Sequence, residues 1–193
     1  MGGDYGVDWG SLRTSHGVGM DPAPIGVMLS APDPGTANKA YWQIEGPAFY
    51  SRYLEEAALP VTRVLVDAVC KGECTYWGTV YATDALVEIT CGEVSFGEMQ
   101  HGNEDLPDRC LAVVRAHLPC LYQMLEQATD DRIRSRLITI VYNAEDDTPT
   151  RQALLEKLSH QDLPGPSDNA LHWNLVEEYG EDRRTQEQNR KKH

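Results

Sequence analysis

The stretch "LPCLYQMLEQATDDRIRSRLITIV", residues 118–141, combines a helical spacing of apolar residues with a proline near its start. Upstream and within it, apolar residues recur in steps of three and four from Cys110 to Leu125. This spacing predicts one long amphipathic helix that starts at Asp105 and contains Pro119. A proline inside a helix removes a backbone hydrogen bond and crowds the preceding turn, at about 3 kcal/mol. We therefore expect Pro119 to kink this helix so that it curves over a neighbour.

The same proline phrase recurs twice upstream, as "ALPVTRVLV" around Pro60 and more loosely as "APIGVML" around Pro24. Pro24 and Pro60 are 36 residues apart, and the Tyr-Trp pairs that begin at Tyr41 and Tyr76 are 35 apart. Each phrase is followed by a polar break and a second helix-like stretch, which predicts repeated helical hairpins. The expected second helices lie within 30–45, 71–89 and 128–144.

The repeat is interrupted between the second and third units, because Pro60 and Pro119 are 59 residues apart. The additional residues map to "CGEVSFGEMQHGNEDLP", residues 91–107, which has three glycines and no helical period. We expect this segment to be a long loop that enters the next helix at Leu106-Pro107. Loops of this length are uncommon in compact domains and often carry function, so the segment is the first place to look for a site.

Composition limits the classes of function. The chain has 193 residues, 41% of them apolar, which suits one compact domain, and no stretch approaches the roughly 18 apolar residues that span a bilayer. The net charge is −13, and because residues 181–193 hold five basic and three acidic residues, residues 1–180 carry −15. A body this acidic repels phosphate backbones and attracts basic proteins. We therefore expect neither nucleic acid nor membrane as a partner.

The five cysteines are odd in number and lie in apolar or mixed helical contexts, which favours buried free thiols over a disulfide framework. The N-terminus lacks the pattern of a secretory signal, so we expect a cytoplasmic, reducing location. Cys70 and Cys74 have no second close pair of ligands, which argues against zinc. Cys91 has no signature of a nucleophile. We accordingly expect no metal, no cofactor and no enzymatic activity.

The third unit resembles HEAT repeats. In these repeats a proline-bearing first helix is followed by a turn with aspartates, here Asp130 and Asp131, and by a second helix that begins hydrophobic-Arg, here Ile133-Arg134. The resemblance covers most of residues 20–160, and the "DW" near the start and "GNEDL" are similar to small bacterial HEAT-repeat proteins. The first unit departs from the pattern with Ala37 at the place of Arg134, and "KGECTYWG" in the second unit lacks both the aspartate and the arginine.

The resemblance implies an all-α fold, an α-solenoid of roughly three to four HEAT-like helical hairpins. On this interpretation residues 1–163 form the solenoid domain, with a further helix expected at 148–159 and Thr148 as its cap. Residues 164–193 are expected to form a linker, a weak helix and a disordered charged tail. Some HEAT-like proteins resemble DNA glycosylases, in which aromatic pairs such as Tyr-Trp stack on flipped bases, but such enzymes need a basic concave face.

The acidic side chains near the long loop favour protein binding. A solenoid leaves an extended curved surface free, and an acidic loop on it is typical of a docking site for a basic protein. We expect an immunity protein or antitoxin that neutralises a basic toxin, with a scaffold or regulatory adaptor as one alternative and a HEAT-like DNA glycosylase as another. For any single acidic residue, a solvated surface position is the simpler explanation. The expected partner-binding residues are Asp84, Glu88, Glu93, Glu98, Glu104, Asp105 and Asp108.

Overall fold

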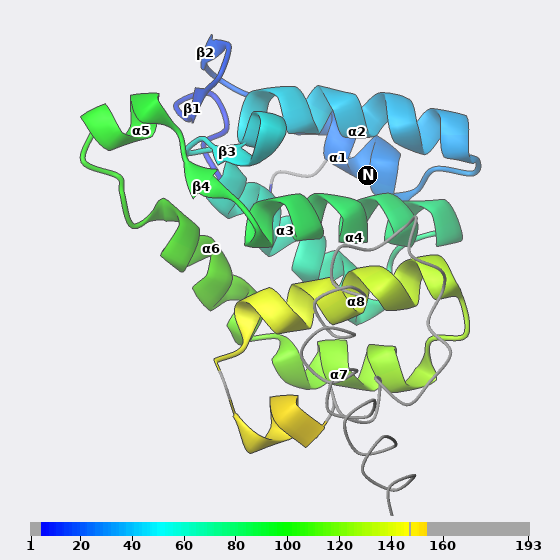
Figure 1. The fold of residues 1–193 in the computed structure, drawn as a ribbon. Coiled ribbons are helices and arrows are strands. Elements are labelled where there is room, and N and C mark those ends of the chain that lie inside the picture. Colours follow the sequence, from blue (N-terminus) through cyan, green and yellow to red (C-terminus); the bar gives the residue numbers. More distant parts are fainter. Residues whose placement is uncertain (1–4, 147, 154–193) are drawn as a thin grey trace, which may run out of the picture.

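The structure is a computed structural model that describes residues 5–146 and 148–153, and this part of the chain is mostly helical (Figure 1). Successive helices contact one another in pairs, which confirms the all-α prediction and the three expected second helices. The predicted tail, residues 164–193, lies outside the described residues. The pairs are α1 (Ala23–Leu29) with α2 (Pro34–Phe49), α3 (Ala58–Lys71) with α4 (Tyr76–Thr90), and α7 (Leu118–Gln127) with α8 (Asp131–Ala144).

The second helices of the three pairs lie side by side in the order α2, α4, α8, with α4 in contact with both of the others (Figure 1). Behind them, α3 contacts α1, α7 and an additional helix, α6 (Leu106–Arg115). The molecule is therefore a two-layered stack of helices in which α3 and α4 are central. The fully buried large side chains come from every helix pair and belong to one continuous core, which includes Ile25, Met28, Ile44, Phe49, Leu65, Leu86, Ile89, Leu121, Leu137 and Ile138.

The repeated prolines begin helices and do not kink them. Pro24 is the second residue of α1, Pro119 is the second residue of α7, and Pro60 is the third residue of α3. The helix predicted to run through Pro119 is in fact two helices, because α6 ends at Arg115 and α7 begins at Leu118. Pro119 has no N–H to donate to the carbonyl of Arg115, so the ladder of α6 stops at that residue. In the first turn of a new helix the same missing N–H has no cost.

The second helices begin differently, with a side chain that accepts hydrogen bonds from the first turn. Asp33 Oδ1 accepts from Thr36 N at 2.9 Å at the start of α2, and Thr75 Oγ1 accepts from Gly78 N at 3.0 Å at the start of α4. Asp130 caps α8 in the same way. Each cap satisfies a backbone donor that the helix cannot. The second helices of the pairs thus start with a capping side chain, which the first helices lack, while a proline in the first turn occurs in both, as at Pro34 of α2.

The segment 91–107 is not a plain loop. It contains β4 (Glu93–Val94), which pairs in parallel with β3 (Tyr53–Leu54), and the short helix α5 (Phe96–Gln100). These elements are too short to show a period in the sequence. The 3-10 turn η1 (Tyr50–Arg52) leads into β3, and an N-terminal hairpin of β1 (Arg13–Thr14) and β2 (Gly17–Val18) lies at the same end of the molecule (Figure 1).

The end of α1 rests directly on the first turn of α4. Thr75 N donates to Leu29 O at 3.0 Å, and Thr75 Oγ1 donates to Ala31 O at 2.7 Å. At Gly78 the two backbones approach so closely that a Cβ atom would lie 2.1 Å from Leu29 O. Only glycine permits this contact, because the obstructing atom belongs to the backbone and cannot rotate away.

Replacing this glycine tests the contact between α1 and α4. Gly→Ala inside a helix ordinarily stabilises it by about 1 kcal/mol. Gly78→Ala should instead lower the free energy of unfolding by about 2 to 3 kcal/mol, because the helices must separate. Gly97→Ala in α5 is the control, since its Cβ would meet only Ser95 Oγ at an ordinary 3.7 Å. Urea unfolding measures both, and equal effects of the two substitutions would contradict the close approach.

Candidate functional site

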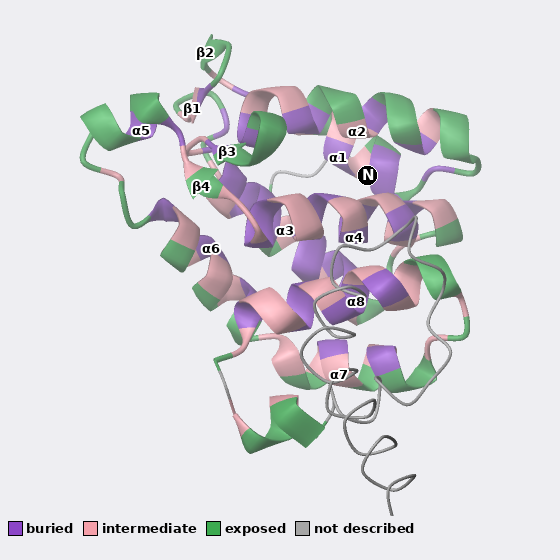
Figure 2. Cartoon of the chain, in the orientation of Figure 1, coloured by how far each residue is buried: buried purple, intermediate pink, exposed green. Residues whose placement is uncertain are grey.

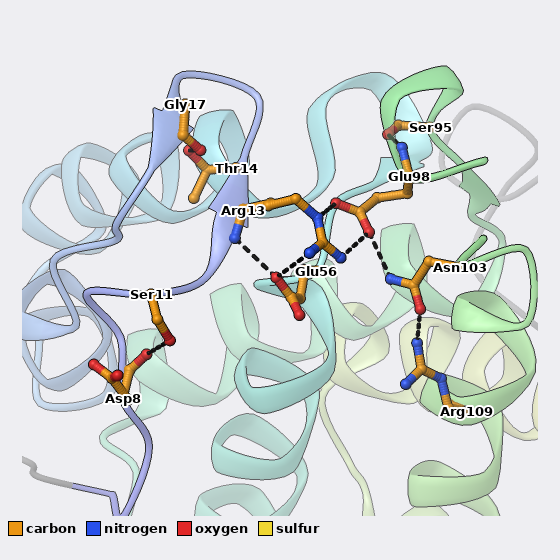
Figure 3. A network of polar contacts seen from close by, with 10 residues as sticks. All are labelled: Asp8, Ser11, Arg13, Thr14, Gly17, Glu56, Ser95, Glu98, Asn103 and Arg109. Atoms are coloured by element: carbon orange, nitrogen blue, oxygen red, sulfur yellow. Dashed lines mark hydrogen bonds and ion pairs between the residues drawn. The ribbon is translucent and has the colours of Figure 1, made fainter. Parts of the chain in front are cut away.

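The segment that follows α4 is held by an ion pair whose carboxylate is buried. Arg13 on β1 donates from Nε and Nη2 to the two carboxylate oxygens of Glu98 on α5, both at 2.8 Å (Figure 3). Glu98 Oε2 also accepts from Asn103 Nδ2 at 2.5 Å. The Glu98 side chain is 1% exposed, and the Arg13 side chain is 33% exposed. Two residues that are 85 positions apart in the sequence thus form a bidentate ion pair on the inner side of α5.

Arg13 also ties the N-terminal hairpin to the beginning of α3. Its backbone N–H donates to Glu56 Oε2 at 3.0 Å, and its Nη1 lies 3.2 Å from the same oxygen. The Arg13 carbonyl accepts from Ala57 N at 3.2 Å. One arginine therefore joins three elements of the chain: the hairpin, the start of α3 and α5 (Figure 3).

The electrostatics of this network favour an ionised Glu98. Desolvation by burial acts to raise the pKa of Glu98, but the hydrogen bonds from Arg13 and Asn103 outweigh it, so the pKa lies below its ordinary value. The hydrogen bond to Glu98 likewise raises the pKa of Arg13. The carboxylate is charged at neutral pH and its charge is compensated within the protein.

Helix α5 has the reverse of the usual surface pattern. Its buried residue is Glu98, whereas Phe96 is 70% exposed and Met99 is 41% exposed. Figure 2 shows exposed residues over most of α5 and a buried position on its inner side. The Ser95 hydroxyl begins the helix by accepting from Glu98 N at 3.1 Å. Polar contacts therefore fix the inner side of α5 and leave its large apolar side chains facing water.

The turn that precedes β3 has an unusual backbone. Ser51 and Arg52 have φ values of 50° and 68°, and they are the residues other than glycine with positive φ in the described part of the chain. The buried carboxylate of Glu45 accepts from the backbone N–H of Ser51, and Arg52 Nε donates to Glu88 Oε2 at 3.1 Å. The left-handed region costs most residues about 1 kcal/mol or more. Contacts from α2 and α4 thus hold this turn in a strained conformation.

The structure divides the seven expected binding residues into two groups. Four have partners within the chain, and Glu98 in particular is buried, so its prediction as an exposed docking residue is wrong. Asp84 pairs with Arg136, Glu88 with Arg52, Glu98 with Arg13 and Asp105 with Arg109. The other three, Glu93, Glu104 and Asp108, are exposed and make no side-chain hydrogen bond or ion pair within the described residues.

Asp105 and Arg109 are four residues apart, a spacing that the sequence shows, but the partners of the other three acids could not be found from the sequence because they lie far away along the chain. Arg13 is 85 residues from Glu98 and Arg136 is 52 residues from Asp84. The local signal at α5 was present but weak: Phe96 and Met99 are three residues apart, a spacing that puts them on the same side of a helix.

The tryptophans of the two Tyr-Trp pairs lie partly at the surface. Trp42 is 57% exposed, while Trp77 is half-buried in a recess of about 370 Å³ between α4 and α8. Two aspartates and two arginines line this recess, so it is not the basic groove that a nucleic-acid enzyme would need. The charged lining residues are Asp84, Asp131, Arg132 and Arg136.

The expectation of five free thiols is wrong for two cysteines. Cys70 near the end of α3 and Cys120 near the start of α7 form a disulfide with their Cα atoms 5.9 Å apart. Next to it, His117 Nε2 lies 2.8 Å from Asp67 Oδ1. The sequence does not reveal this pair, because 50 residues separate the cysteines and only the fold brings them together. Cysteine usage therefore no longer supports a reducing location.

No family model matches the chain, and neither the curated proteins nor the solved structures include a significant match. The resemblance to HEAT repeats thus stays a prediction. Among the described residues, no helix is long and apolar enough to cross a membrane, and no three His, Cys, Asp or Glu side chains are grouped as a metal site would require.

The Arg13–Glu98 pair can be tested by removing one partner. Arg13→Met leaves the buried carboxylate without its guanidinium and should lower the free energy of unfolding by about 2 kcal/mol, less than for a fully buried pair because Arg13 is partly exposed. Arg52→Met, which breaks the more exposed pair with Glu88, should cost under about 1 kcal/mol. Adding Glu98→Met to Arg13→Met should restore part of the loss. Strictly additive effects in urea unfolding would contradict a direct pair.

The lowered pKa of Glu98 predicts a pH dependence with a definite sign. A carboxyl whose pKa is lower in the folded state contributes its full stabilisation of the fold when the pH lies above its pKa in the unfolded state, about 4.3. This stabilisation is lost as the pH falls through the pKa of the folded state. The difference in unfolding free energy between the wild type and Glu98→Gln should therefore be constant near pH 6 and shrink between about pH 5 and 3. A difference that stays constant on acidification would show that Glu98 is not held ionised by Arg13.

Proposed function

We propose that this protein is an acidic protein-binding module whose partner is a basic protein. The observation that carries the proposal is a set of exposed carboxylates, Glu93, Glu104 and Asp108, without partners in the described chain. They flank a segment that the Arg13–Glu98 pair anchors firmly. Residues 1–180 carry a net charge of −15, which attracts a basic partner over a long range and raises its association rate.

The arrangement that we propose for this module is a HEAT-like α-solenoid. Three consecutive helix pairs whose second helices contact in the order α2, α4, α8 support it. Such a stack buries each pair against its neighbours and leaves a long surface for a partner. The segment 91–107, inserted between the second and third pairs, then projects from one end of that surface (Figure 1).

Within this class, the role we favour is an immunity protein or antitoxin that covers the active surface of a basic toxin. A protein that must bind before damage occurs benefits from electrostatic steering, which raises association rates well above the neutral range. A scaffold or regulatory adaptor would use the same surface with weaker and more varied partners. The number and tightness of the captured partners distinguish these two roles.

The proposal predicts that charge at one end of the molecule controls partner capture. The test variant combines Glu93→Lys, Glu104→Lys and Asp108→Lys. The control combines Glu73→Lys, Glu126→Lys and Asp131→Lys, which changes net charge equally and, like the test, alters one acid in the first turn of a helix. Both should fold, because these side chains are exposed.

The readout is capture from the native cell lysate with elution in steps of rising salt. We expect the wild type and the control to retain one dominant basic polypeptide that leaves only at high salt, and the test variant to release it at low salt. Several weakly held partners would favour a scaffold. Equal loss in both variants would mean that net charge alone acts, and retention of nucleic acid or of nothing would contradict the proposed function.

A further inference from the structure

We propose that the outward side of α5, formed by Phe96 and Met99 and called here the α5 face, is the apolar anchor of the binding site. Its occupant is a partner segment that places a large apolar side chain among lysines or arginines. This inference rests on the proposed function and deepens it, because it names the contact that gives the acidic surface its selectivity.

The first support is the clustering of exposed apolar side chains. Nine large hydrophobic residues are exposed in the described part of the chain, and four of them lie in two short segments, residues 50–53 and 96–99. The β3–β4 ladder pairs the end of the first segment with residues 93–94, just before the second, with Tyr53 opposite Glu93. Tyr50 and Tyr53 are 60% and 54% exposed. Isolated exposed apolar residues are normal, but a concentration of them marks an interaction site.

The second support is the way in which α5 is oriented. An ordinary surface helix would turn Phe96 and Met99 inward and Glu98 outward. Here Arg13 and Asn103 hold the carboxylate inside at 2.8 Å and 2.5 Å, which fixes the opposite rotation. Burying an ion pair in place of two apolar side chains gives little or no stability in return. The arrangement is explained if the apolar side of α5 has to remain available to a partner.

The third support is the strained turn beside it. Ser51 and Arg52, both with positive φ, lie between the two exposed tyrosines, and they are held by Glu45 and by Glu88. Strained backbone of this kind concentrates at sites of function. Both segments of the cluster are therefore maintained in position by polar contacts that a purely structural surface would not need.

The acidic residues that flank α5 along the chain indicate the charge of its occupant. Glu93 precedes Phe96 by three residues, and the exposed Glu104 and Asp108 follow on the turn and first helical turn after α5. A second copy of this chain would bring two such acidic sets together, which is repulsive. A segment with an apolar side chain flanked by basic ones satisfies both features at once, with burial at the centre and ion pairs at the rim.

The test uses two synthetic helical peptides of equal charge, one built of lysine and leucine and the other of lysine and alanine. Affinity is measured by fluorescence anisotropy, and the site is located by NMR of the methionine methyl groups, of which that of Met99 belongs to the α5 face. The leucine peptide should bind at least about tenfold more tightly, since burial of a large apolar side chain is worth that much, and should shift the Met99 methyl signal first.

The double variant Phe96→Ser and Met99→Ser should abolish the preference for leucine while leaving alanine-peptide binding and helical content unchanged. The matched control is Val27→Ser, because Val27 on α1 is also a helical apolar residue and is 49% exposed. This variant should keep the preference for the leucine peptide. Equal affinities of the two peptides, or a preference that survives the double variant, would overturn the anchor while acidic docking stands. If neither peptide binds, both proposals are contradicted. If the protein forms a dimer that Phe96→Ser abolishes, the α5 face binds a second copy of the chain and the proposed occupant is wrong.

Discussion

The contact between Arg13 and Glu98 determines how one end of this protein is built. A guanidinium from the N-terminal hairpin and a carboxylate from α5 meet at 2.8 Å through two hydrogen bonds, and the same arginine contacts Glu56 at the start of α3. Because a buried carboxylate without a partner is strongly unfavourable, α5 can occupy its position only while the hairpin is in place. The helix stack supplies the core, and this pair supplies the orientation of the segment that projects from it.

That orientation explains why α5 buries its charged Glu98 and exposes its apolar Phe96 and Met99. In the longer helices most large apolar side chains face the common core, so local pattern and global fold agree there. At α5 they disagree, and at the neighbouring turn the backbone at Ser51 and Arg52 is strained. Disagreements of this kind are expected at sites where function imposes its own demand. Their coincidence with exposed, unpartnered carboxylates makes one end of the molecule the best candidate for partner recognition.

Much of the fold could be predicted from the sequence, because its determinants are local. The three second helices follow from apolar spacing and from caps such as Asp130. The sequence shows the prolines as repeated markers, but the prediction that they lie inside helices is wrong. A first-turn proline and a kinking proline differ only in where the helix starts. The short elements of residues 91–107 have too few residues for a period. The Arg13–Glu98 pair and the Cys70–Cys120 disulfide depend on contacts across 85 and 50 residues, which no local pattern contains.

If Arg13 holds α5 with its apolar side outward, losing Arg13 should loosen this segment, and hydrogen–deuterium exchange of residues 93–103 measures that loosening. In the wild type, the amides of Glu98, Met99 and Asn103, which donate within this segment, should be protected. In Arg13→Met these amides should exchange at least about tenfold faster, while the amides of α4 and α8 keep their wild-type exchange rates. In the control variant Arg52→Met, all amides of residues 93–103 should keep their wild-type exchange rates. If Arg13→Met leaves the protection of this segment intact, the Arg13–Glu98 pair does not position α5.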